Sequence, residues 1–138
     1  MPVPPGLVEA YRKARYRVLG PDGDFELRVG EPSPAADALL GREAASCAAL
    51  LTAWNPRSRT RDDAANAAAQ ATLQADLAGH PVHPAEGSGD KWEVEPSLFV
   101  AGLSRAEALV LAQRHGQHAF LWLERGGPVE LVLADAPA

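Results

Sequence analysis

The sequence contains a single cysteine, Cys47, among its 138 residues. One thiol cannot close an intramolecular disulfide, and it cannot provide a cysteine-rich zinc site. We therefore expect Cys47 to act as a small buried apolar residue.

The chain has four histidines, arranged as two His-x-x-His pairs. Two such pairs would supply enough imidazole for zinc if they met in space. However, His80 and His83 fall in a predicted loop, and His115 and His118 span the predicted end of a helix, so neither pair shares one helical face. We therefore predict neither a metal site nor a cofactor.

Long apolar runs and an excess of basic residues are also missing. No apolar run approaches the roughly 20 residues of a membrane helix, and the first residues lack the pattern of a secretory signal. The formal net charge is −5, whereas binding along a nucleic-acid backbone requires clustered Lys and Arg. The basic clusters at 12–17 and 57–61 are local, and such a cluster can bind one phosphate or carboxylate. We expect a cytoplasmic protein with no membrane partner, and the charge disfavours a nucleic-acid partner.

The motifs of several common enzyme classes are missing as well. No glycine-rich turn followed by Lys-Ser or Lys-Thr connects a strand to a helix, as a phosphate-binding loop requires. Gly87-Ser88-Gly89 lies in a predicted loop, so it does not form the strand-to-helix turn of a serine nucleophile. The sequence names no reaction, and whether the protein is an enzyme stays open.

Hydrophobic residues make up 46% of the chain and charged residues 22%, which is typical of a globular protein. A chain of this length can bury a core without disulfides, so we expect residues 1–138 to form one domain.

Hydrophobic spacing, caps and turn residues predict alternating helices and strands. The predicted helices are 7–14, 34–41, 62–77 and a last helix from the Ser104 cap to Gly116. The predicted strands are 15–19, 25–29, 48–54, 92–95, 98–101, 118–123 and 129–133, with a surface loop at 80–91 and a break or a sheet edge at Pro96. This order predicts an α+β domain: a mixed, mostly antiparallel sheet with a hairpin near each end and three or four packed helices.

The clearest candidate site is the end of the apolar run Leu50–Ala53, which stops at Trp54-Asn55-Pro56. Asn66 and Gln70 follow at a spacing of four residues, so they share one face of the predicted helix 62–77. Amides beside an indole suit the recognition of a small polar molecule. The alternative is structural: Asn55 makes a local turn and Trp54 belongs to the core.

A second candidate is Glu95, in Glu95-Pro96-Ser97. A carboxylate beside a rigid proline is suited to act as a base or to anchor an arginine. The alternative is a solvated or ion-paired glutamate.

Several short motifs, in this order, resemble a bacterial family known as domain of unknown function 3293. They are Tyr11 with Tyr16, Thr52-Ala53-Trp54-Asn55-Pro56, Asn66, Leu73, Glu95-Pro96-Ser97, and Gly116-Gln117 followed by Ala119. The resemblance implies a compact, cytoplasmic bacterial domain, and it carries no activity. It adds Gln117 to the candidate site residues, which are Trp54, Asn55, Asn66, Glu95 and Gln117.

Three hypotheses follow from these observations. The first is a domain, or a hydrolase-like enzyme, that takes a small polar ligand near Trp54. The second is a non-enzymatic interaction module or regulatory accessory protein, in which the same residues only fix loop geometry. The third, nucleic-acid binding through the basic clusters, is disfavoured by the net charge.

Overall fold

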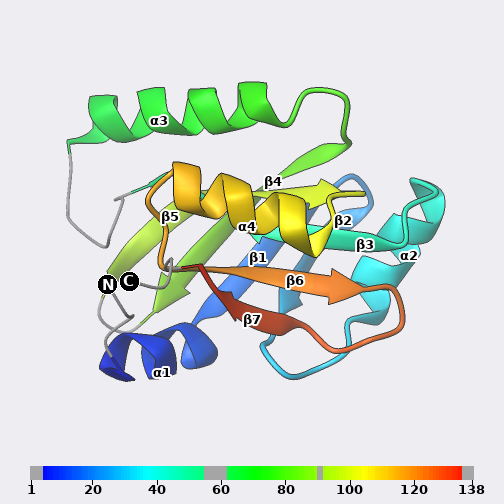
Figure 1. Cartoon of the computed structure of the whole chain (residues 1–138). Helices are drawn as coiled ribbons and strands as arrows, with labels where there is room; N and C mark the ends of the chain where they lie inside the picture. Colours follow the sequence, from blue (N-terminus) through cyan, green and yellow to red (C-terminus); the bar gives the residue numbers. More distant parts are fainter. Residues whose placement is uncertain (1–4, 55–61, 90–91, 135–138) are drawn as a thin grey trace.

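The structure is a computed structural model, and it describes residues 5–54, 62–89 and 92–134 (Figure 1). These residues form four helices and seven strands. The helices are α1 (Pro5–Lys13), α2 (Pro34–Arg42), α3 (Asp63–Asp76) and α4 (Arg105–Arg114). The strands are β1 (Arg15–Gly20), β2 (Gly23–Leu27), β3 (Cys47–Leu51), β4 (Val82–Gly89), β5 (Trp92–Ala101), β6 (Ala119–Glu124) and β7 (Glu130–Leu133).

The strands form one sheet in the order β2-β1-β4-β5-β3-β6-β7, and each named strand pair is antiparallel. Parallel pairing in the described part of the chain is limited to an isolated bridge between Val29 and Val129. Both predicted terminal hairpins are present, β1 with β2 and β6 with β7. The predicted α+β fold is therefore confirmed.

The predicted loop at 80–91 is wrong, because Val82–Gly89 is strand β4, between β1 and β5. Its one proline and two glycines have low strand propensity, but the stability of a strand depends strongly on packing against the neighbouring strands. Gly87 illustrates this, since a Cβ built on it would lie 3.6 Å from the ring of Tyr16 on β1. Neighbouring side chains cover the strand, and its own small residues leave room for them.

Pro96 does not break β5, which runs continuously from Trp92 to Ala101. Strand β3 pairs only with the Leu98–Ala101 part of β5, so Pro96 lies where β5 has lost its neighbour on that side. The carbonyl of Pro96 accepts a hydrogen bond from Thr52 at 2.8 Å on this side. The N–H and C=O of one strand residue point the same way, so the missing N–H removes no bond to β4. Strand β5 is an interior strand, but at Pro96 it has a strand neighbour on one side only, so the predicted edge position is correct for this part of the strand.

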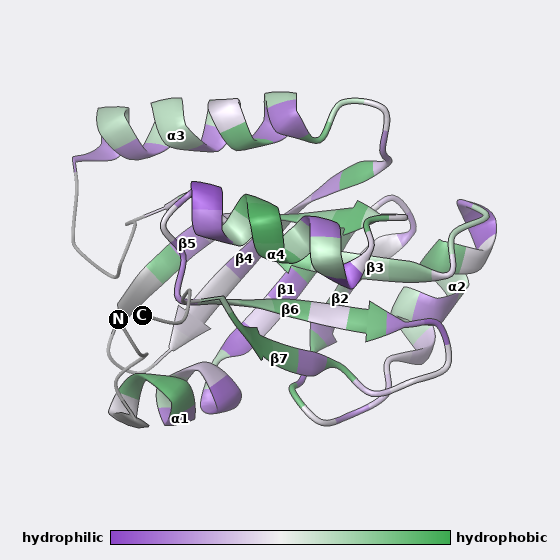
Figure 2. Cartoon of the chain, viewed as in Figure 1, coloured by the Kyte–Doolittle hydropathy of each residue, from purple (hydrophilic) through white to green (hydrophobic). Residues whose placement is uncertain are grey.

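The sheet has a hydrophobic core on each face. Leu50 and Phe99 face the core that contains α2, whereas Leu51 and Val100 face the core that contains α3 and α4. Because both faces are covered, β3 and β6 are predominantly hydrophobic along their length (Figure 2). Cys47 is partly buried at the start of β3, and burial raises the pKa of its thiol.

The sheet is curled around α2. The core beneath α2 includes residues from both sheet edges, Leu27 of β2 and Leu131 of β7. Two backbone hydrogen bonds connect the chain beyond these edges, from Gly30 N to Val129 O at 2.8 Å and from Val129 N to Glu31 O at 2.9 Å. The α2 face is therefore concave, and α3 and α4 pack on the convex face.

Side-chain caps mark the starts of α2, α3 and α4. The side chains of Ser33 and Asp62 accept backbone hydrogen bonds at the starts of α2 and α3. Ser104, the predicted cap of α4, forms a capping box with Glu107. Gly116 follows the last residues of α4 with a φ of 67°, a conformation that suits glycine.

We expect Leu73→Ala to lower the free energy of unfolding by about 2–5 kcal/mol, because it leaves a cavity where α3 packs on the sheet. Leu73 is 1% exposed. Urea unfolding followed by circular dichroism measures the change. Gln74→Ala, at an exposed position of the same helix, is the control and should stay within about 0.5 kcal/mol of the parent chain. Equal values for the two variants would contradict this packing.

Candidate functional site

The candidate site is the corner formed by Thr52, Ala53 and Trp54. Strand β3 ends at Leu51, three residues before the predicted end at Trp54, and the chain then leaves the sheet. Ala53 is fully buried and Trp54 is partly exposed. Side chains from α3, from the segment after α4 and from the corner itself bind its backbone.

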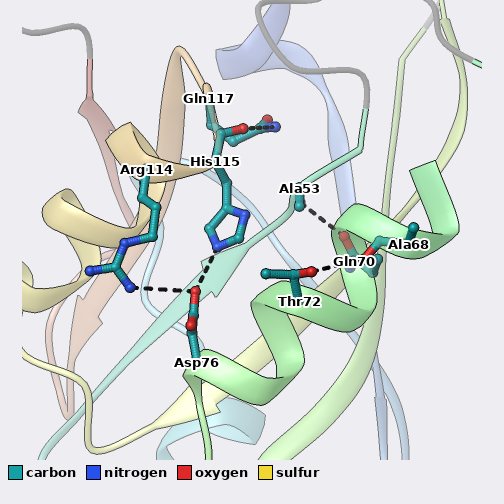
Figure 3. Close-up of polar contacts among 8 residues, drawn as sticks. All are labelled: Ala53, Ala68, Gln70, Thr72, Asp76, Arg114, His115 and Gln117. Atoms are coloured by element: carbon teal, nitrogen blue, oxygen red, sulfur yellow. Dashed lines mark hydrogen bonds and ion pairs between the residues drawn. The ribbon is translucent and has the colours of Figure 1, made fainter. Parts of the chain in front are cut away.

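Gln70 of α3 anchors the corner to β5. Its Oε1 accepts a hydrogen bond from the Ala53 N–H at 2.9 Å (Figure 3). Its Nε2 donates to the Pro96 carbonyl at 3.2 Å. Thr52 adds a second connection, because its hydroxyl donates to Pro96 and accepts from the Trp54 N–H at 3.0 Å. The backbone groups of Ala53, Trp54 and Pro96 have no strand partner where β3 has ended. These side chains supply their hydrogen bonds instead.

Gln117 anchors the corner from the other side. Its Nε2 donates to the Trp54 carbonyl and to the His115 carbonyl, each at 3.2 Å. His115 is the C-cap of α4, so this amide ties the end of a helix to the end of a strand. Figure 3 shows Gln117 and His115 together at this helix end.

An ion-pair cluster joins the last turns of α3 and α4. The Asp76 carboxylate lies 2.9 Å from His115 Nε2 and 3.5 Å from Arg114 (Figure 3). The His115 side chain is 7% exposed and the Asp76 side chain 24%, so the imidazole is shielded from solvent whereas the carboxylate keeps some access to it. The hydrogen bond from His115, aided by the charge of Arg114, lowers the pKa of Asp76. The sequence had suggested His115 only as a metal ligand and had not suggested Asp76.

The structure brings part of the predicted residue set together. Trp54 and Gln117 meet at the corner, and Asn66 lies one helical turn before Gln70, with only 1% of its surface exposed. Asn55 lies outside the described residues.

Glu95 is separated from this group by the sheet. Side chains alternate along a strand, and Phe99 faces the α2 core, so Ser97 and Glu95 face the same concave side. Burial, the Tyr11 hydroxyl and the Glu95 carboxylate, in that order, raise the pKa of Tyr16. Glu95 therefore belongs to a cluster near α1 and β1, on the opposite face from Asn66.

The histidine pairs are engaged separately. His83 Nε2 lies 2.7 Å from the Glu43 carboxylate on the concave face, and His115 binds Asp76 on the convex face. Within residues 5–54, 62–89 and 92–134, no three His, Cys, Asp or Glu side chains are arranged to hold a metal ion. In the same residues, no helix has the length and apolar character needed to cross a bilayer.

A groove of about 240 Å³ lies elsewhere, between α2 and the β1–β2 turn. Its lining includes the apolar residues Phe25, Ala35, Ala38 and Leu39 and the turn residues 20–24. Arg42, also in its lining, forms an ion pair with Asp22 of the turn. The groove shares no residue with the Trp54 corner.

The fold and the corner define an α+β domain in which side chains from separate elements hold a partly exposed tryptophan. Comparison with protein-family models matches residues 51–120 to the family described as "Protein of unknown function (DUF3293)". The chain belongs to this family, and the resemblance found in the sequence is confirmed. No curated protein and no solved structure matched the chain. The matched segment contains all five predicted site residues.

We expect Gln70→Met to lower the free energy of unfolding by about 1–3 kcal/mol, because it leaves the buried Ala53 N–H without its acceptor. Urea unfolding measures this change. Gln74→Met makes the same substitution one turn later, at an exposed position. Equal stabilities of the two variants would show that the Gln70 amide does not hold the corner.

We expect the Asp76 pair to stabilise the fold at neutral pH and to stop doing so in acid. A carboxyl whose pKa is lower in the folded state adds stability above its unfolded pKa, roughly 3.9, and that stability is lost as pH falls through the lower folded value. Urea unfolding measured from pH 6 to about pH 2 should therefore show a weaker pH dependence of the free energy of unfolding for Asp76→Asn than for the parent chain.

The control for this measurement is Asp63→Asn, at the opposite end of α3. Its pH profile should keep the slope of the parent chain. Parallel profiles for Asp76→Asn and the parent would contradict the role assigned to the Asp76–His115 pair.

Proposed function

We propose that the chain binds a small polar ligand against Trp54, at the corner where β3 ends. The observation that supports this most is the contrast between side chain and backbone at Trp54. The side chain is partly exposed, yet the Trp54 N–H and C=O are bound by Thr52 and Gln117. An aromatic wall on a fixed backbone, with amides beside it, suits recognition of a small molecule.

Trp54 and Gln117 are the proposed contact residues, together with Asn55, which directly follows Trp54 in the sequence. Gln70 is proposed as a supporting residue, because both ends of its amide bind main-chain groups. Asn66 is buried one turn before it and is proposed in the same supporting role. Glu95 is not part of this proposal, since it faces the concave side of the sheet.

The interaction-module hypothesis remains the alternative. Large exposed hydrophobic residues in the described part of the chain are Val94, Val110 and Leu133, which lie on three different elements. This distribution does not favour a protein-docking face over a ligand site. A bacterial, cytoplasmic setting is likewise a proposal, supported by the features that the chain shares with its family.

We expect small planar polar molecules to shift the indole N–H signal of Trp54 in ¹H–¹⁵N NMR spectra. The probes are benzamide, uracil and nicotinamide, each titrated into the ¹⁵N-labelled chain. The signal is assigned by its loss in Trp54→Phe. Binding against the indole should shift this signal in a saturable way, because ring currents and hydrogen bonding change around it.

The chain provides an internal control in Trp122. Its indole N–H donates to the Leu103 carbonyl at 3.1 Å and its side chain is buried, so its signal should stay in place. Signals of Trp54 and Trp122 that move together would indicate a general effect on the fold. A Trp54 signal that no probe shifts would refute the proposed function.

A further inference from the structure

We propose that Gln117 determines the specificity of the Trp54 site by acting only as a hydrogen-bond acceptor. The site then selects planar ligands that present an N–H donor, such as a primary amide or a lactam ring, over equally shaped molecules without one. This inference rests on the proposed function and names its ligand class.

The orientation of the Gln117 amide follows from its partners. An amide side chain has one end that donates and one that accepts, and the two ends have nearly the same shape. One end of the Gln117 amide faces two backbone carbonyls, those of Trp54 and His115, each at 3.2 Å. Carbonyl oxygens only accept, so this end must be the NH₂ group. The reverse orientation would place three oxygens against one another.

Both hydrogens of the NH₂ group are therefore used within the protein. Oε1 is left as the remaining polar atom of the side chain, and no hydrogen bond to it forms within residues 5–54, 62–89 and 92–134. Gln117 is also partly exposed. A ligand that approaches this side chain therefore meets an acceptor to which none of the described residues donates.

The two carbonyls that fix the amide are themselves fixed. The Trp54 carbonyl belongs to the corner that Gln70 and Thr52 hold. The His115 carbonyl belongs to the C-cap of α4, and Asp76 holds the ring of the same residue at 2.9 Å. Turning the amide to offer a donor would break two hydrogen bonds. Gln117 is thereby restricted to one of the two roles that a glutamine normally has.

The restriction predicts which ligand groups fit. A carboxylate or a ketone would place its oxygen against Oε1 and leave that acceptor unpaired, which is unfavourable once water is excluded. An N–H on a planar ligand can donate to Gln117 Oε1, while the plane of the ligand packs on the Trp54 indole. The chemical class is therefore a planar amide or lactam.

The test compares benzamide with acetophenone, in which a methyl group replaces the NH₂ of nearly the same size. Dissociation constants come from titrations followed by the Trp54 indole signal. We expect benzamide to bind the parent chain roughly tenfold more tightly, as expected for one hydrogen bond whose loss leaves its partner unpaired. Gln117→Met should bind the two probes equally. Gln113→Met, at an exposed position of α4, is the matched control and should keep the preference.

The outcomes separate this inference from the proposed function. Equal binding of benzamide and acetophenone to the parent chain would overturn the acceptor role and leave the ligand site standing. If only nicotinamide or only uracil shifts the Trp54 signal, the comparison uses its analogue without an N–H donor, 3-acetylpyridine or 1,3-dimethyluracil, and equal binding again overturns the acceptor role. If no probe shifts the signal, the proposed function fails and this inference fails with it. The comparison on the parent chain needs no variant, so it holds even if Gln117→Met is unstable.

Discussion

The arrangement around the candidate site depends on one side chain, the Gln70 amide. It accepts from Ala53 and donates to Pro96, so a single group on α3 connects the end of β3 to the adjoining part of β5. Neither backbone group has a strand partner on that side, because β3 has already ended. The Gln70 amide thus replaces the hydrogen bonds that a longer β3 would have made with β5. The chain can therefore turn away from the sheet at Trp54 without leaving these backbone groups unpaired.

Most of the fold could be predicted from local signals in the sequence. Ser33-Pro34, Asp62 and the Ser104–Glu107 box mark helix starts, because capping is a property of a few neighbouring residues. The terminal hairpins could be predicted for the same reason. Strand β4 could not be predicted in this way, because it is stabilised by pairing with two other strands. One of them, β1, lies more than 60 residues earlier in the sequence, and the other, β5, comes after it. Its composition describes a loop, and only the neighbouring strands make it a strand.

The candidate site was predictable in location but not in detail. The end of an apolar run identified Trp54, and helical spacing correctly placed Asn66 and Gln70 on one face. Spacing cannot show that Glu95 faces the other side of the sheet, because that depends on the register of β5 with its neighbours. Nor can it show the contact between Asp76 and His115, which are 39 positions apart and meet only because two helix ends pack together.

The contact between Val29 and Val129 has a consequence for how the chain reaches its final shape. These residues lie a hundred positions apart, and the curl around α2 closes only when both are in place. During synthesis, α2 emerges long before β7, so one side of its apolar surface stays uncovered until the last hairpin has been made. Contacts between distant parts of a chain form slowly, because a large loop must close first. Closure of the curl is therefore a step that must wait until Val129 and the strand that follows it, β7, have been synthesised.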